Sequence, residues 1–233
     1  MDMNDKSPEY RKGYEEGYAA ALEKAGVFFA KDSGCTSNVK VYGLQDSIRR
    51  AKFPMSVDTN RPTSELTSGI RALAQSNQGE GHDQWLTGVI VQFDLTFSNK
   101  AWVEAERYHF LDFISSQSTM HRITRFDLNK GYNEYVDDAI VEIMKRKVTE
   151  YNLLLDNDAS EEEKKRKYLE ILYSNPAGFR ITAGMTTNYR QLKTIYFQRR
   201  THRLPEWREF CRWIETLPYS ELITGKKAEE TEE

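Results

Sequence analysis

Residues 87–97 alternate between apolar and polar side chains, and this pattern limits the fold more than any other part of the sequence. Successive side chains of a β-strand point to opposite faces of its sheet, so the alternation predicts a strand with one buried face. That face needs other elements to cover it. It would carry Val89, Val91, Phe93, Leu95 and Phe97, with Gln92, Asp94 and Thr96 on the other side.

Helical spacing of apolar residues dominates the rest of the chain. We expect helices over 7–26, 45–52, from Thr63 to about 74, from Asn99 to about 113, 133–155, 161–174, from Thr186 or Thr187 to about 200, and from Leu204-Pro205 onward, with a short strand at 39–42. The prediction is a single α/β (α+β) domain over residues 1–224, with an antiparallel or mixed sheet flanked by helices and a helical C-terminal half. Residues 225–233 would form a disordered acidic tail.

The first helix carries a stripe of tyrosines. Tyr10, Tyr14 and Tyr18 recur every fourth residue, which places them on one helical face. We expect this face to point into the core. The glycines that precede Tyr14 and Tyr18 leave open a second interpretation, close packing against a partner helix.

Charge and cysteine usage exclude several classes of protein. The 33 basic and 36 acidic residues leave a net charge of -3, so no global field favours nucleic acid. Cys35 and Cys211 form no CxxC pair and the four histidines lack metal-ligand spacing, so we expect reduced thiols and no metal. No apolar run is long enough to cross a membrane, and the polar N-terminus indicates a cytoplasmic protein.

Residues 186–207 are the most informative segment for function. Asn188, Leu192, Ile195 and Arg199 are spaced to share one helical face, so an amide and a guanidinium would frame an apolar stripe. Arg190, Arg200, His202 and Arg203 lie close by. Guanidinium groups match phosphates and carbonyl-rich bases. Arginines late in a helix also complement its dipole in solvent, and that interpretation stays open.

The same segment resembles the C-terminal signature of flavin-dependent thymidylate synthases. Its positions are occupied by Asn188, Arg190, Leu192, Phe197, Arg199, His202 and Trp207, with one extra residue between Arg199 and Trp207. Upstream, Gly81-His82 matches the Gly-His loop of that family, and residues 108–121 stand where its arginine-rich fingerprint is expected. The resemblance spans about residues 63–216.

Within that fingerprint, His109 and Ser118 match the family pattern. Tyr108 and Phe110 replace the two leading arginines, while Arg107 and Arg122 stand nearby. A small shift in register would let those two arginines substitute.

The resemblance implies a homotetramer that binds FAD and dUMP in clefts between subunits. Reduced FAD would supply hydride, methylenetetrahydrofolate the one-carbon unit and NADPH the reducing equivalents, in the host cytoplasm if the chain is phage-encoded. Arg199 would act on the uracil as the catalytic residue. Ser118, Gln117 and Arg190 would bind the nucleotide, and His109, Asn188, Arg190, His202 and Arg107 the flavin.

The replaced fingerprint residues leave two other functions open. One is a related one-carbon transfer to a pyrimidine nucleotide, such as hydroxymethylation. The other is a nucleotide-binding protein of the same fold without flavin chemistry.

Overall fold

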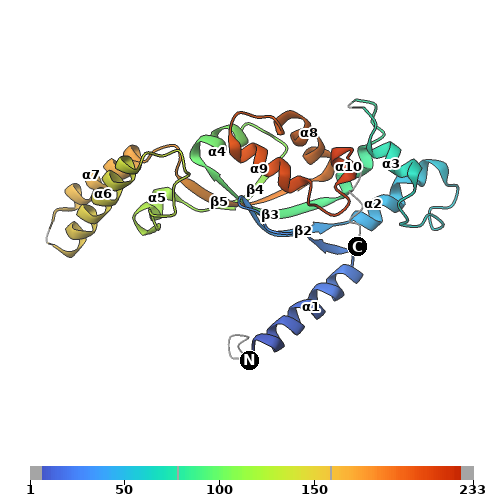
Figure 1. Cartoon of the computed structure of the whole chain (residues 1–233), viewed down its shortest axis with the longest axis horizontal. Coiled ribbons are helices and arrows are strands. Elements are labelled where there is room, and N and C mark those ends of the chain that lie inside the picture. Colours follow the sequence, from blue (N-terminus) through green and yellow to red (C-terminus); the bar gives the residue numbers. More distant parts are fainter. Residues whose placement is uncertain (1–6, 78, 158, 227–233) are drawn as a thin grey trace. The chain divides into compact units, whose positions relative to one another are not determined.

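The computed structural model describes residues 7–77, 79–157 and 159–226 (Figure 1). The predicted α/β (α+β) class is confirmed, because helices flank a five-stranded sheet. Most of the acidic tail, from residue 227, lies outside the described residues. The elements are α1 (Pro8–Lys24), β1 (Val27–Phe29), β2 (Thr36–Tyr42), α2 (Leu44–Ala51), η2 (Phe53–Met55), α3 (Ser68–Ala74), η3 (Gln84–Gly88), β3 (Ile90–Ser98), α4 (Asn99–Ala105), β4 (Asp112–Ser116), α5 (Thr119–Arg122), η4 (Ile123–Arg125), α6 (Asp138–Asp156), α7 (Glu161–Ser174), β5 (Arg180–Asn188), α8 (Tyr189–Arg199), α9 (Pro205–Ile214) and α10 (Glu221–Thr224).

The sheet has the strand order β1-β2-β3-β5-β4, with β1 and β2 antiparallel. The strand predicted at 87–97 is β3, and its side chains alternate between buried and less buried positions as expected. Sequence analysis missed β1, β4 and β5. No element was predicted between 174 and the helix after Thr186 or Thr187, although β5 occupies most of this segment and leads directly into α8.

The chain divides into two compact units. Unit 1 comprises the described parts of Met1–Phe93, Phe110–Asp112 and Thr186–Glu233. Unit 2 comprises Asp94–His109 and the described parts of Phe113–Met185. The predicted single domain over 1–224 stays a prediction, and each unit has its own core.

Unit 1 is built around aromatic packing between β3 and α9. The ring of Phe93 lies 5.8 Å from that of Phe210 and 4.8 Å from that of Trp213. At the start of α8, the fully buried Tyr189 donates its hydroxyl hydrogen to the carbonyl oxygen of Pro218 at 2.5 Å. These contacts explain why the apolar residues of α8 and α9 are core residues.

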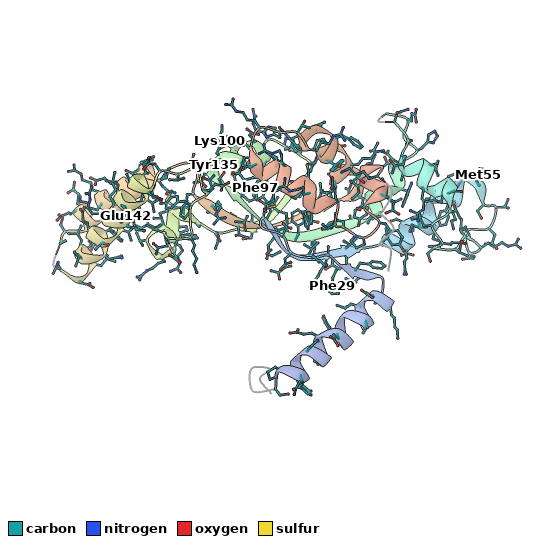
Figure 2. All side chains as sticks on the ribbon, viewed as in Figure 1. Phe29, Met55, Phe97, Lys100, Tyr135 and Glu142 are labelled. Carbon is teal, nitrogen blue, oxygen red and sulfur yellow. The ribbon has the colours of Figure 1, made fainter. Side chains whose placement is uncertain are left out.

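Unit 2 contains the helix pair α6 and α7, which pack side by side (Figure 1). Its main cluster holds the buried residues Ile123, Leu128, Met144, Ile171 and Phe179. A second contact fixes α4: the buried Phe97 (Figure 2) packs 5.5 Å from the ring of Trp102. The indole nitrogen of Trp102 donates to the carbonyl oxygen of Ile181 in β5 at 3.1 Å.

Several predicted helix boundaries were wrong. The helix expected from Thr63 begins at Ser68, because the side chain of Thr67 accepts the hydrogen bond that caps it. The helix expected from 133 is α6, which begins at Asp138 behind the capping side chain of Asp137. Both helices begin a few residues after the predicted positions, because the capping side chains fix where they start.

The helix expected from Asn99 to about 113 was wrong in its second half, because α4 ends at Ala105 and a strand follows. Phe113 instead belongs to β4, and its ring packs 5.1 Å from Trp102. An edge strand is stabilised by pairing with residues far away in the sequence, so local periodicity did not reveal it.

The tyrosine stripe of α1 does not point into a core. Tyr10, Tyr14 and Tyr18 are 54%, 54% and 55% exposed. The rings of Tyr14 and Tyr18 stack on each other at 6.3 Å. The core-facing prediction was therefore wrong, although α1 begins at the predicted place behind the capping side chain of Ser7.

Both cysteines are buried and free of disulfides. Among the described residues, no cluster of His, Cys, Asp or Glu is suited to a metal ion. None of the described helices is both long and apolar enough to cross a bilayer.

Candidate functional site

Helix α8 begins at Asn188, whose side chain works as the N-cap. The Asn188 Oδ1 accepts from the Gln191 backbone nitrogen at 3.0 Å, and its Nδ2 donates to the Gln191 Oε1 at 2.8 Å. Capping satisfies backbone donors that have no partner inside the helix. The cap is neither of the two threonines that the sequence predicted. The amide expected to contact flavin is engaged in starting the helix.

The apolar stripe of α8 belongs to the core. Leu192 and Ile195 are fully buried. The stripe that Asn188 and Arg199 frame is therefore closed to a ligand. Arg190 and Arg199 are nine residues apart, which at about 100° per residue places them on opposite sides of the helix. Each must be considered with its own neighbours.

Arg190 lies in a charged cluster around Asp83. The Asp83 carboxylate accepts from the Arg190 Nε at 3.0 Å and from the Lys193 Nζ at 2.9 Å. The Lys193 Nζ also donates to the carbonyl oxygens of Ala74 and Ser76, at 2.8 and 2.9 Å. One lysine on α8 thus holds both ends of the loop that follows α3.

The Asp83 carboxylate is almost fully buried, with 6% of its side chain exposed. Burial by itself raises the pKa of this carboxyl, but the hydrogen bonds from Lys193 and Arg190 outweigh burial and bring the pKa below its ordinary value. Asp83 therefore stays ionised at neutral pH and holds Arg190 in one orientation.

A pocket of about 260 Å³ opens beside this cluster, on the side of α8 that carries Lys193. Its walls combine the loop after α3 with one face of α8. The Oγ of Ser76 is buried and has no hydrogen-bond partner among the described residues. A buried hydroxyl without a partner is costly, so this position suits a ligand that supplies one. The lining residues are Gln75, Ser76, Asn77, Asp83, Lys193, Thr194, Phe197 and Gln198.

Arg199 and His202 form a second group at the other end of α8. The Arg199 guanidinium lies 5.1 Å from the ring of Trp207, a cation–π geometry. The His202 Nδ1 accepts from the backbone nitrogen of Leu204 at 3.2 Å. A neutral imidazole that accepts at Nδ1 carries its hydrogen on Nε2, so His202 presents an N–H donor.

The remaining predicted site residues lie in unit 2. Gln117 is tied to β5, because its backbone nitrogen donates to the Thr182 carbonyl oxygen and its Oε1 accepts from the Thr182 nitrogen, both at 2.9 Å. Ser118 precedes α5 and is partly buried. Arg107 and His109 are exposed in the turn after α4.

The structure thus groups Arg190 with Asp83 and Lys193, and Arg199 with His202, whereas the Asn188 side chain caps α8. Sequence analysis missed Asp83 and Lys193. A signal existed, because Lys193 follows Arg190 at helical spacing and Asp83 lies in a polar loop. Only the fold shows that the two segments meet.

No protein-family model and no curated protein sequence matches this chain. Solved structures do. A flavin-dependent thymidylate synthase ThyX from Helicobacter pylori, complexed with FAD and dUMP, superposes with a TM-score of 0.58 at 14% identity, covering 86% of this chain and 98% of that one. The fold is that of a flavin-dependent thymidylate synthase.

A second structure of Helicobacter pylori ThyX with FAD and dUMP agrees, with a TM-score of 0.57 at 14% identity over 83% of this chain and 97% of that one. The superposition covers nearly the whole length of both solved chains. At this level of identity the likeness establishes the fold, whereas the chemistry depends on this chain's own residues.

Proposed function

We propose that this protein transfers a one-carbon unit from methylenetetrahydrofolate to C5 of dUMP, with FAD as its cofactor. The observation that supports this most is the fold, which is shared along almost the full length of enzymes solved with FAD and dUMP. Helix α8 carries Arg190 and Arg199, and His202 follows it before α9 begins.

The donor chemistry around α8 fits these ligands. Arg190, Arg199 and His202 are all N–H donors, while flavin and dUMP offer carbonyl and phosphate oxygens as acceptors. The buried Ser76 hydroxyl beside Lys193 adds a further polar group that lacks a partner among the described residues. Together these groups offer the hydrogen-bond donors that a nucleotide site needs.

In this proposal Arg199 donates to a uracil carbonyl and stabilises charge that develops on the ring, so that C5 becomes nucleophilic. Trp207 keeps the guanidinium in place through the 5.1 Å contact. Ser118, Gln117 and Arg190 bind the nucleotide, and Asn188, Arg190, His202, His109 and Arg107 hold the flavin. Reduced FAD, regenerated with NADPH, supplies the hydride when bound.

These residues act by position and polarity, because the reaction needs no side-chain nucleophile in this scheme. We further propose that the sites form between copies in a homotetramer and that the protein works in the cytoplasm. In such an assembly, unit 1 of one copy and unit 2 of another copy would contribute residues to the same site.

A second candidate is a nucleotide-binding protein without flavin chemistry. Two observations favour it: Tyr108 and Phe110 stand where the family has arginines, and Arg107 lies in an exposed turn. Asp83 also takes up part of the positive charge of Arg190. A third candidate, hydroxymethyl transfer to a pyrimidine nucleotide, uses the same site and differs in its product.

The first experiment is a titration of the purified protein with FAD and with dUMP, followed by mass analysis of the product after addition of methylenetetrahydrofolate and NADPH. Flavin absorbance bands and a methylated product would support the proposal. A protein that binds dUMP but takes up no FAD would establish the second candidate, and a hydroxymethylated product would establish the third.

The residue-level experiment replaces Arg199 with Ala and with Lys. Removing a donor aimed at developing charge costs about 10²–10³-fold in turnover. Lys should not rescue the activity, because a single ammonium does not reproduce the planar guanidinium. The exposed Arg203 provides the matched control, Arg203→Ala. Near wild-type turnover in Arg199→Ala, with an unchanged unfolding curve, would eliminate the role of Arg199.

A further inference from the structure

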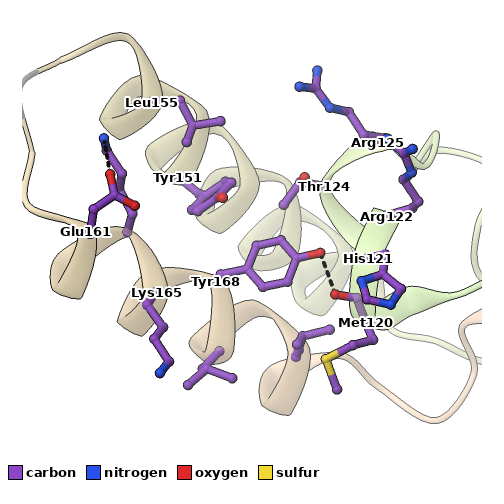
Figure 3. Close-up of a pocket in the computed structure, with 13 residues that line it drawn as sticks. Met120, His121, Arg122, Thr124, Arg125, Tyr151, Leu155, Glu161, Lys165 and Tyr168 are labelled. Carbon is purple, nitrogen blue, oxygen red and sulfur yellow. Dashed lines mark hydrogen bonds and ion pairs between the residues drawn. The ribbon is translucent and has the colours of Figure 1, made fainter.

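A groove of about 590 Å³ lies in unit 2, between α7 with the end of α6 and the segment from α5 to η4 (Figure 3). None of the residues assigned above to the flavin or the pyrimidine nucleotide lines it. Its volume falls within the range of pockets that bind small molecules, about 300–1,000 Å³. Its lining is mainly basic, aromatic and aliphatic, and its one carboxylate, Glu161, is paired with Lys164.

The positive charges on the α6–α7 pair are almost all held in ion pairs. Every Lys and Arg of these two helices except Lys165 forms an ion pair with a glutamate, for example Arg146 with Glu150 and Lys164 with Glu161. Lys165 lines the groove and has no such partner among the described residues.

The opposite wall of the groove, formed by α5 and η4, also carries cations that form no ion pair with the described residues. Arg122 and Arg125 line the groove, are exposed, and form no ion pair with any residue that the structure describes. Figure 3 shows Arg122 and Arg125 on one side of Tyr168 and Lys165 on the other. On α5, η4, α6 and α7, the Lys and Arg side chains without an ion-pair partner among the described residues all line the groove, where a multiply charged anion would meet them from two sides.

The floor between these charges is aromatic and aliphatic. The rings of Tyr151 and Tyr168 lie 5.2 Å apart, and the Tyr168 hydroxyl donates to the Met120 carbonyl oxygen at 3.0 Å, which fixes its ring. Leu155 and Leu169 also line the groove and are 43% and 37% exposed. Such a surface suits a flat aromatic group.

We propose that this groove binds a nucleoside polyphosphate, with the phosphates between Arg122, Arg125 and Lys165 and the base against Tyr151 and Tyr168. A polymer such as RNA fits less well, because the ion-paired cations elsewhere on α6 and α7 offer no continuous basic track. An inorganic anion would leave the aromatic floor unused.

The test is calorimetric titration of the full chain at fixed ionic strength with ATP, with tripolyphosphate and with adenosine. ATP should bind more tightly than either fragment, because it alone uses both the cations and the rings. Equal affinity for ATP and tripolyphosphate would overturn the proposal in favour of a simple anion patch. Tighter binding of a single-stranded oligonucleotide than of ATP would overturn it in favour of a nucleic-acid surface.

Variants locate the binding. Arg125→Glu combined with Lys165→Glu removes a cation from each wall, and hydrogen bonds to charged groups are strong enough that ATP should bind at least about 100-fold more weakly. Both side chains are exposed, so the fold should tolerate the change. Arg122 is left in place because it follows closely after Ser118, which is assigned to dUMP.

The matched control is Arg146→Glu combined with Arg166→Glu, which makes the same change in net charge on the same helix pair outside the groove. The control should leave the affinity for ATP within about threefold of the wild type, because exposed charges at a distance are largely screened. Equal losses in the two double variants would overturn the groove as the site.

Discussion

Replacing Asp83 with Asn tests the charged cluster that orients Arg190. Hydrogen bonds to charged groups contribute about 1.5–3 kcal/mol each when buried. The bond from Lys193 should keep this value, since only 11% of the lysine side chain is exposed, whereas the Arg190 side chain is 37% exposed and its bond is worth less. Asn keeps one acceptor oxygen and places an amide donor towards the other cation. We expect a loss of about 2–3 kcal/mol in the free energy of unfolding.

The assay is thermal unfolding of the variant and the wild type. For a chain of this length, about 1 kcal/mol corresponds to roughly 2–4 °C in Tm, so the predicted shift is about 4–12 °C. The control is Glu142→Gln, which breaks an exposed pair with Lys145 on α6 (Figure 2). That change should cost at most about 0.5 kcal/mol.

The effect of Asp83→Asn should also depend on pH. The folded pKa of Asp83 lies below its ordinary value of 3.8 because the hydrogen bonds from Lys193 and Arg190 outweigh burial. Its stabilisation is then complete above the unfolded pKa and is lost as the pH falls through the folded pKa. The difference between wild type and variant should be constant near neutral pH and shrink below pH 3.8. A shift no larger than that of Glu142→Gln, or one unchanged in acid, would refute this reasoning.

Two further predictions concern backbone geometry and the thiols. Gly43→Ala should destabilise the fold by more than about 1 kcal/mol, because Gly43 has φ +72° and an added Cβ would lie 2.5 Å from the Gly88 carbonyl oxygen. Gly13→Ala, in open space on α1, should instead stabilise the fold by up to about 1 kcal/mol, and unfolding of both variants checks the contrast. Burial raises the pKa of Cys35 and of Cys211 to about 12, so both thiols should resist alkylation in the native protein at pH 8 and react on unfolding; rapid native labelling of both would contradict the buried environment.

The sequence determined those elements whose signals lie within a few residues. Helix α7 begins behind the capping Ser160, and its stop at Asn175-Pro176 was visible in the same stretch. Strand β3 was visible from its alternation alone. In such elements the order of apolar and polar residues predicts which side chains face the core, because the period of a helix or strand fixes the direction of each side chain.

The candidate site was predicted less well, for a physical reason. The spacing of Asn188, Leu192, Ile195 and Arg199 indicated a shared face but not whether that face was buried. Leu192 and Ile195 proved to be core residues, while Lys193 faces a pocket. Periodicity distinguishes the faces of a helix, and only the packing around α8 decides which of them meets solvent.

Tertiary structure alone decided the contacts between distant segments. Strand β4 exists through pairing in the sheet, which overrode the apparent helical periodicity of residues 99–113. Asp83 meets Arg190 and Lys193 across more than a hundred residues of chain. The entropic cost of bringing such segments together is offset by packing throughout the core, so no local sequence pattern shows which segments meet.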